Sequence, residues 1–190
     1  MNYSEGMLEW LTVEGRLTDG LPIRLYIAGQ EEQICAACLH DDAHPRTPDE
    51  FEWRLHHGKT PVERSSESPK SELLHLAKLQ VSEYFSGRRL QFDVPLRWQG
   101  TAFQIRVWQE LARIPFGTTR SYQEIAEQIG NPKAARPVGS ANGKNRLPLF
   151  VPCHRVVAAG GKLGGFTGGL GLKKRLLAHE AAVSGNSLPL

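Results

Sequence analysis

The sequence is short of several features that define common protein classes. It holds three cysteines in 190 residues, an odd number and too few for a disulfide scaffold. No hydrophobic run is long enough to span a bilayer, and residues 1–6 lack the basic flank and apolar core of a secretory signal. We therefore expect a reducing, cytoplasmic setting (the nucleus in a eukaryote) and no membrane partner.

Acidic residues are also scarce in the second half of the chain. Residues 1–95 hold 10 Lys and Arg against 16 Asp and Glu, a net charge of −6. Residues 96–190 hold 13 against 4, a net charge of +9, and the two halves add to the +3 of the whole chain. A basic half beside an acidic half indicates a polyanion partner such as nucleic acid. A solvated basic surface without a partner is the alternative.

The first half alternates between strand and loop patterns and ends in a helix. Residues 8–40 predict strands, including a hairpin. Residues 41–60 are polar and predict a long loop. A helix then opens with Ser68 as N-cap and Pro69 at its first position, and it ends at Gly87.

The second half, entered through an extended connector, is predicted to be mostly helical. Thr101 with Gln104, and Ser121 with Glu124, have the spacing of capping boxes that start two helices. These pairs stand directly before apolar residues at helical spacing, so both helices are expected to pack one face against a core.

A helix-turn-helix follows the second capping box. The first of its helices ends at Gly130, and the next begins near Ala134 or Ala135, so that Pro137 lies in the first turn, where its missing N–H costs nothing. The predicted fold class is α/β: a small N-terminal domain with an antiparallel sheet and a helix, then a mostly helical C-terminal domain with a helix-turn-helix.

The segment Pro152-Cys153-His154-Arg155-Val156 carries the most chemical information. A cysteine is a strong nucleophile only as thiolate, and an imidazole backed by an acid is a standard way to produce one. A candidate acid, Glu180, stands downstream. For a dipeptide alone, a buried structural cysteine is the default interpretation, so the surrounding motifs decide.

Those motifs resemble, in order and spacing, the O6-alkylguanine-DNA alkyltransferase family from about Phe92 to Glu180. They are Phe92-Asp93-Val94-Pro95-Leu96, Gly100-Thr101-Ala102-Phe103-Gln104, Val107-Trp108, Ile114-Pro115-Phe116-Gly117-Thr118, Ser121-Tyr122, Ala134-Ala135-Arg136-Pro137-Val138-Gly139, Asn145, the cysteine segment, Gly165-Phe166-Thr167-Gly168-Gly169 and Ala178-His179-Glu180. The resemblance divides the chain into an N-terminal αβ domain (1–91), a catalytic and DNA-binding domain (92–182) and a tail (183–190).

The resemblance implies a DNA repair protein that moves the alkyl group of O6-alkylguanine, and of O4-alkylthymine, irreversibly onto Cys153. Each molecule acts once, and no cofactor is implied. His154 would take the thiol proton through a water, Glu180 would orient the imidazole, and Asn145 would brace the site. By the same logic His154 and Glu180 should lower the pKa of the Cys153 thiol below its ordinary value.

The resemblance also assigns residues to the damaged base. Tyr122 would donate a hydrogen bond to it, assisted by backbone amides near Thr167, and the carbonyl of Val156 would read the guanine edge. Phe166 would line the alkyl pocket, without the hydroxyl group that many relatives have there.

Double-stranded DNA is the implied partner, bound through its minor groove with the alkylated base flipped out. Arg136 would fill the gap left in the stack, and the small residues Ala135 and Gly139 would let the helix approach closely. Pro137 stands where many relatives have alanine. We expect a monomer in solution that can assemble cooperatively on DNA.

Two other functions and one metal site are the alternatives. Non-catalytic alkyltransferase-like proteins bind lesions but replace the cysteine, and a cysteine hydrolase would leave the basic half unexplained. Some relatives bind structural zinc, and here Cys35 and Cys38 precede His40 and His44. Residues three apart in a strand point to opposite faces, so we predict no metal site and expect both cysteines to pack in the core.

Overall fold

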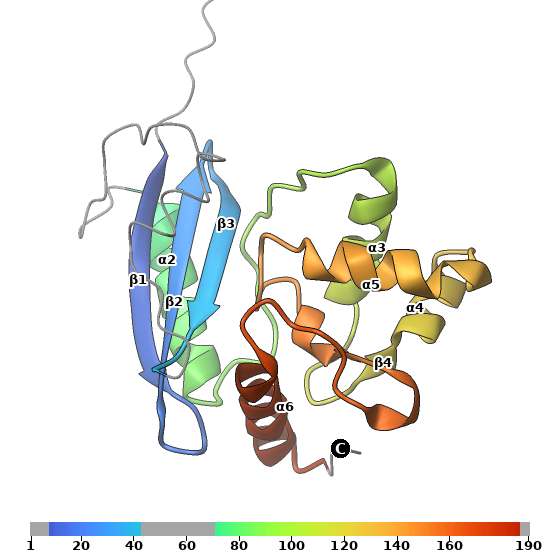
Figure 1. Cartoon of the computed structure of the whole chain (residues 1–190). Coiled ribbons are helices and arrows are strands. Elements are labelled where there is room, and N and C mark those ends of the chain that lie inside the picture. Colours follow the sequence, from blue (N-terminus) through green and yellow to red (C-terminus); the bar gives the residue numbers. More distant parts are fainter. Residues whose placement is uncertain (1–7, 43–70, 187–190) are drawn as a thin grey trace, which may run out of the picture.

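The computed structural model describes residues 8–42 and 71–186. Its first half is a three-stranded antiparallel sheet in the order β1-β2-β3 (Figure 1). The strands are β1 (Glu9–Arg16), β2 (Pro22–Gln30) and β3 (Gln33–His40). The predicted strands and hairpin are confirmed, and the predicted loop lies almost wholly outside the described residues.

Helix α2 (Glu72–Phe85) packs against the sheet, with Leu74, Ala77 and Val81 fully buried between them (Figure 1). Its N-cap is Ser71, whose hydroxyl oxygen accepts from the amide of Leu74 at 3.4 Å. The described helix therefore begins three residues later than predicted, and Ser68 and Pro69 themselves lie outside the described residues. The amide of Ser71 donates to the Glu9 carboxylate at 3.1 Å, which ties the start of α2 to β1.

The second half is helical, as predicted. Its α-helices are α3 (Ala102–Ala112), α4 (Tyr122–Gln128), α5 (Ala135–Gly143) and α6 (Leu170–Ser184), with short 3-10 turns η1 (Pro132–Ala134), η2 (Cys153–Arg155) and η3 (Ala159–Gly161). Both predicted capping boxes are present at the starts of α3 and α4.

Helices α4 and α5 form the predicted helix-turn-helix, joined through η1. Gly130, just after α4, has φ +74°, a conformation that favours glycine and ends the helix. Helix α3 supports the pair from behind: the indole of Trp108 donates to the carbonyl of Ala141 at 2.9 Å. Val107, Leu111 and Val138 are fully buried in the shared core. Helix α5 is therefore packed firmly against α3.

A small parallel sheet connects the helix-turn-helix to the cysteine segment. Strand β4 (Arg120–Ser121) pairs with β5 (Val156–Val157). Because β4 leads directly into α4 and β5 follows η2, this pairing fixes the first residue of α4, Tyr122, beside the Cys-His motif.

Helix α6 lies where the two halves meet (Figure 1). Arg175 forms ion pairs with Asp19 at 2.7 Å and with Asp41 at 2.9 Å. His179 accepts from the amide of Thr18 at 3.2 Å and contacts the carbonyl of Tyr84 at 2.9 Å. One side of α6 is thus bound to the N-terminal half.

Strand β3 adds backbone contacts to that junction. The amide of Ile34 donates to Pro95, and the amide of Ala37 donates to Arg146, each at 2.8 Å. Among the described residues, no helix is long and apolar enough to cross a membrane.

Candidate active site

Cys153 opens the 3-10 turn η2 and is 5% exposed. Its amide donates to the carbonyl of Val151 at 2.8 Å, and the amide of Arg155 donates to Pro152 at 2.9 Å. These bonds tighten the chain around the thiol. The cysteine therefore lies in a short turn that leads directly into β5.

Asn145 braces the segment leading into that turn. Its side-chain amide donates to the carbonyl of Val151 at 2.8 Å, and its side-chain oxygen accepts from the amide of Leu147 at 2.9 Å. Leu149 in the same segment has φ +78°, an uncommon backbone conformation for a branched residue. Asn145 thus holds a tight turn whose end carries Cys153.

His154 and Glu180 lie in contact, both fully buried. The Nε2 atom of His154 is 2.8 Å from Oε1 of Glu180. Because a carboxylate only accepts, Nε2 carries the proton, and Nδ1 is then the basic nitrogen. Nδ1 is buried and makes no hydrogen bond with any residue in the described ranges. The geometry therefore gives an oriented neutral imidazole with a free basic atom.

The carboxylate of Glu180 accepts hydrogen bonds from three residues besides His154. The guanidinium of Arg155 grips it with Nη2 at 2.8 Å from Oε1 and Nε at 2.9 Å from Oε2. The hydroxyl of Tyr84 donates to Oε1 at 2.7 Å, and the amide of Gly117 donates to Oε2 at 3.0 Å. Arg155 also donates to the carbonyl of Ile114 at 2.7 Å. The carboxylate charge is thus neutralised by a buried cation next to the imidazole.

Burial and neighbouring charges determine the protonation states of Glu180 and His154. Burial would raise the pKa of Glu180, but His154 and Arg155 outweigh it and hold the pKa well below its usual value. Burial lowers the pKa of His154, against the opposing pull of Glu180. The resting site therefore holds an ionised Glu180 and a neutral His154.

The predicted low pKa of the thiol is wrong. Burial raises the pKa of Cys153, and the side chain of Asn145 and the cation of Lys173 offset this only in part. The loss of water around the buried sulfur destabilises the thiolate, and this cost cannot be seen in the sequence.

Lys173 is fully buried on α6, two turns before Glu180 and on the same face. Its ammonium donates to the carbonyl of Val156 at 2.5 Å and to that of Gly164 at 3.1 Å. Burial lowers its pKa to about 8, while the neighbouring Cys153 thiol raises it. Lys173 therefore joins β5 to the glycine-rich loop (residues 160–169) and places positive charge near the thiol.

A cleft opens beside this group, between the helix-turn-helix and the glycine-rich loop. The sequence-predicted residues Tyr122, Ala135, Arg136, Gly139, Phe166 and Thr167 all line it. Phe166 and Thr167 also line a second, smaller cavity that contains Cys153 and Asn145. The two cavities therefore adjoin, with Phe166 and Thr167 as their shared wall.

Individual side chains in the cleft differ in exposure. Tyr122 is half-buried, and burial raises its pKa, with Cys153 adding to the effect. Arg136 is exposed in the first turn of α5. Val156 lines neither cavity and is fully buried, with its carbonyl bonded to Lys173. The structure thus brings all the predicted recognition residues except Val156 to the cleft.

Cys35 and Cys38 both lie in a buried cluster with Trp10 and Tyr26. The expectation that they point to opposite faces is wrong, because the pairing of β2 with β3 shifts register between Ala28 and Gly29, and this bulge returns both cysteines to one face. Within residues 8–42 and 71–186 no group of three metal-ligating side chains occurs, and His44 lies outside these ranges. Packing in the core, the interpretation preferred from the sequence, describes both cysteines.

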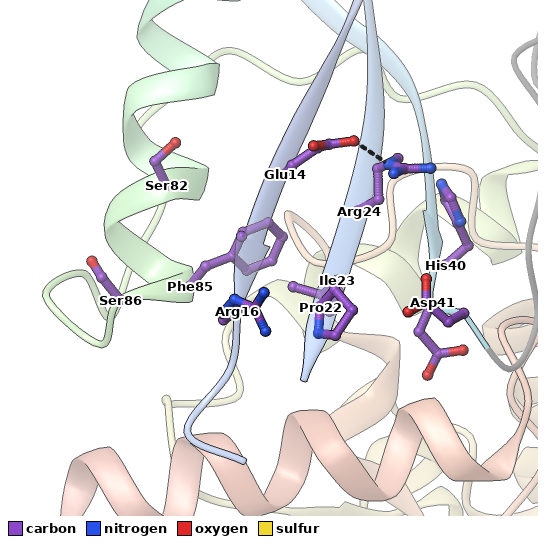
Figure 2. A pocket seen from close by; sticks show the side chains of 12 residues that line it. Glu14, Arg16, Pro22, Ile23, Arg24, His40, Asp41, Ser82, Phe85 and Ser86 are labelled. Carbon is purple, nitrogen blue, oxygen red and sulfur yellow. Dashed lines mark ion pairs between the residues drawn. The ribbon is translucent and has the colours of Figure 1, made fainter. Parts of the chain in front are cut away.

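A further depression lies at one end of the sheet and is lined by residues of β1, β2 and α2 and by the end of β3 (Figure 2). Its charged residues largely pair with each other or with α6: Glu14 with Arg24 at 2.6 Å, and Asp41 with Arg175 at 2.9 Å. These ion pairs tie the carboxylates that line the depression to arginines of β2 and α6.

Sequence reasoning missed three residues of the site: Tyr84, Arg155 and Lys173. Lys173 stands seven residues before Glu180 in an otherwise apolar stripe, a signal that could have been read from the helical period. Arg155 directly follows the Cys-His pair and offered a similar hint. Tyr84 is 96 residues away from Glu180 along the chain, and no local pattern announces that contact.

Two family models match the chain. The model described as "6-O-methylguanine DNA methyltransferase, ribonuclease-like domain" covers residues 24–98, and "6-O-methylguanine DNA methyltransferase, DNA binding domain" covers residues 102–182.

Several curated relatives are named methylated-DNA–protein-cysteine methyltransferase. The protein of Mycolicibacterium paratuberculosis is 55% identical over 111 residues, which is 58% of this chain and 67% of the relative. The constitutive protein of Bacillus subtilis is 42% identical over 144 residues, 76% of this chain and 80% of the relative. The match to the Mycobacterium bovis protein, at 55% identity, spans only 61% of that protein's length.

Solved structures agree over nearly the whole chain. The O6-methylguanine methyltransferase of Mycobacterium tuberculosis has a TM-score of 0.71 and 38% identity, with 93% of this chain and 94% of that chain covered. A structure of the M. tuberculosis protein in complex with DNA has a TM-score of 0.71 and 37% identity, with 92% and 94% covered. The chain therefore belongs to the 6-O-methylguanine DNA methyltransferase family.

Proposed function

We propose that this protein repairs DNA by transferring the alkyl group of O6-alkylguanine to the sulfur of Cys153, once per molecule. The observation that carries the proposal is the buried Cys153, followed by an imidazole that Glu180 holds at 2.8 Å, next to a cleft walled by a helix-turn-helix. Family membership supports the same chemistry. The catalytic and DNA-binding work is assigned to residues 92–182.

The proposed reaction balances without a cofactor. The sulfur attacks the alkyl carbon, the S–C bond forms, and the C–O6 bond breaks. The thiol proton passes to Nδ1 of His154 through a bridging water. The departing guanine anion takes up a proton at ring N1 from solvent, and the imidazolium of His154 returns its proton to solvent, so no net proton is gained or lost. The products are S-alkylcysteine and normal guanine in DNA. Because no step regenerates the thiol, the protein is consumed.

Because His154 is neutral in the resting protein, the thiolate of Cys153 forms only when the imidazole takes up the thiol proton. With Arg155 compensating Glu180, protonation of His154 adds a buried positive charge that only a new anion nearby can offset. A thiolate formed together with the imidazolium supplies that anion, and Lys173 lies close enough to stabilise it. Attack by the Cys153 sulfur is thereby coupled to proton transfer to His154. The free protein holds the thiol in its protonated form.

Tyr122 is proposed to donate its hydroxyl to the departing base. Its raised pKa keeps the phenol protonated at neutral pH, as a hydrogen-bond donor to developing negative charge requires. Phe166 supplies an apolar wall for the alkyl group, and backbone amides near Thr167 contact the base. Val156 can still read the guanine edge through the second lone pair of its carbonyl.

DNA is proposed to bind along α5 through its minor groove. Exposed Arg136 would enter the stack in place of the flipped base, and the lack of bulk at Ala135 and Gly139 would let the backbone approach. The net charge of +9 on residues 96–190 supports binding to phosphates. We propose a monomer in solution, with cooperative assembly on DNA.

The test is a time course with duplex DNA carrying one O6-methylguanine, in excess over protein. We expect repaired DNA to reach the protein concentration and then stop. Binding without repair would instead indicate a lesion-binding protein, and continued turnover with release of the methyl group would indicate a hydrolase.

A further inference from the structure

The N-terminal half places one hydroxyl group inside the catalytic network. Tyr84, in the last turn of α2, is fully buried and donates to Oε1 of Glu180 at 2.7 Å. The Nε2 atom of His154 binds the same oxygen at 2.8 Å. A residue outside the catalytic domain therefore shares the atom that orients the base.

The aromatic ring of Tyr84 is held on several sides. It lies 5.6 Å from the ring of Phe92, 5.8 Å from Phe116 and 5.4 Å from His179, between ring centroids. These contacts account for the burial of the ring but not for its hydroxyl, since a phenylalanine could make them. The hydroxyl makes its bond to a carboxylate that already has donors from Gly117 and Arg155.

Sharing one oxygen has a definite electrostatic consequence. A phenol that donates to Oε1 withdraws electron density from the atom that stabilises a proton on His154. The charged groups besides Glu180 that act on the imidazole are Arg155 and Lys173, and both disfavour the imidazolium. His179 is a further titratable group at this place, with its ring 5.4 Å from that of Tyr84. Among these side chains, the hydroxyl of Tyr84 is a neutral donor, so its removal leaves the net charge around Glu180 and His154 unchanged.

We propose that Tyr84 is a positioning residue for alkyl transfer: its hydroxyl fixes Oε1 of Glu180 and thereby sets the proton affinity of His154. The N-terminal half then takes part in the chemistry in addition to supporting the fold. This inference rests on the proposed function only in the choice of reaction used to observe it.

The experiment compares pH profiles of single-turnover methyl transfer in the full chain. Tyr84→Phe removes the donor, so Oε1 should bind the His154 proton more strongly, and the acid limb should move to higher pH by roughly half to one unit. Tyr84→3-fluorotyrosine strengthens the donor and should move the limb to lower pH. Burial and Glu180 raise the pKa of Tyr84 well above its usual value, so its phenol stays protonated throughout.

Tyr26→Phe is the matched control, because Tyr26 is also buried but belongs to the cluster with Trp10. Its profile should superimpose on that of the parent. Coincident profiles for all four proteins would overturn the proposal, even if Tyr84→Phe lowered stability. Should Tyr84→Phe fail to fold, the fluorotyrosine protein, which keeps the hydroxyl, decides alone.

Titration of the His154 ring by NMR reads the same effect without any reaction. If the parent transferred no methyl group, the proposed function would fail, yet the ring titration would still shift between parent and variant if Tyr84 acts as proposed. The two failures are therefore distinguishable.

Discussion

Replacing Glu180 with glutamine probes the buried network with almost no change in shape. The carboxylate accepts from His154, Arg155, Tyr84 and Gly117, with donors on both oxygens. A glutamine side chain offers one oxygen and one NH2 group. Its NH2 group would therefore face N–H or O–H donors that now bind one of the two carboxylate oxygens. The substitution also leaves the cation of Arg155 without its anion.

The cost follows from burial. Arg155 is 6% exposed and Glu180 is fully buried, and breaking such a pair from one side costs about 3–5 kcal/mol of the free energy of unfolding. In a chain of this size each kcal/mol corresponds to about 2–4 °C in Tm, so Tm should fall by roughly 10 °C. The matched control is Glu14→Gln, because its partner Arg24 lies at 2.6 Å but both side chains are exposed; that pair contributes at most about 1 kcal/mol.

The loss should depend on pH with a fixed sign. The pKa of Glu180 is held below its usual value in the folded protein. Its stabilisation is therefore fully present above the unfolded pKa, about 4.3, and is lost as pH falls below that value. The difference in stability between parent and Glu180→Gln should shrink on going from pH 7 toward pH 3.

Urea unfolding at several pH values measures this difference, and single-turnover transfer measures its catalytic consequence. Glu180→Gln should also slow transfer at saturating DNA while DNA affinity stays close to that of the parent. The reasoning would be refuted if Glu180→Gln and Glu14→Gln lost the same stability at pH 7, or if the loss did not change with pH.

Three further perturbations test other parts of the site. Arg136→Ala should slow repair of duplex DNA by tenfold or more at saturation (about 1.4 kcal/mol), while reaction with free O6-benzylguanine changes little; equal slowing would contradict the role in base flipping. Lys173→Met should raise the pKa of the Cys153 thiol further, seen by titrating thiolate absorbance, and an unchanged titration would remove Lys173 from thiolate stabilisation. Gly164→Ala would push a methyl group into the hydroxyl of Tyr122, so transfer should slow with DNA affinity kept; parental kinetics would show that Tyr122 can move freely.

Local signals in the sequence predicted the fold well. The capping boxes at Thr101 and Ser121 depend only on residues three apart, and both formed. The helix-turn-helix likewise follows from helix-stop and helix-start residues close together in the chain.

Features that depend on contacts between residues far apart in the sequence could not be predicted from local patterns. The cap of α2 is Ser71, whose amide donates to Glu9, a residue far away in sequence. A register shift in the sheet, invisible in strand alternation, put Cys35 and Cys38 on one face.

The candidate site divides in the same way. Cys153, His154 and Glu180 could be singled out from residue type and motif order, and the structure brings His154 and Glu180 into contact. The sign of the thiol pKa could not be predicted, because it depends on burial and on Lys173, which only the packed structure reveals. Tyr84 joins the network through tertiary packing of α2 alone.

The most direct test of the central claim is the position of the transferred group. After reaction with duplex DNA containing O6-methylguanine, intact mass should rise by one methyl group, and peptide mass spectrometry should place it on Cys153. Cys153→Ser should bind the same DNA and gain no mass, because a hydroxyl is a far weaker nucleophile at neutral pH. A methyl group found on Cys35 or Cys38, or transfer that persists in Cys153→Ser, would contradict the account.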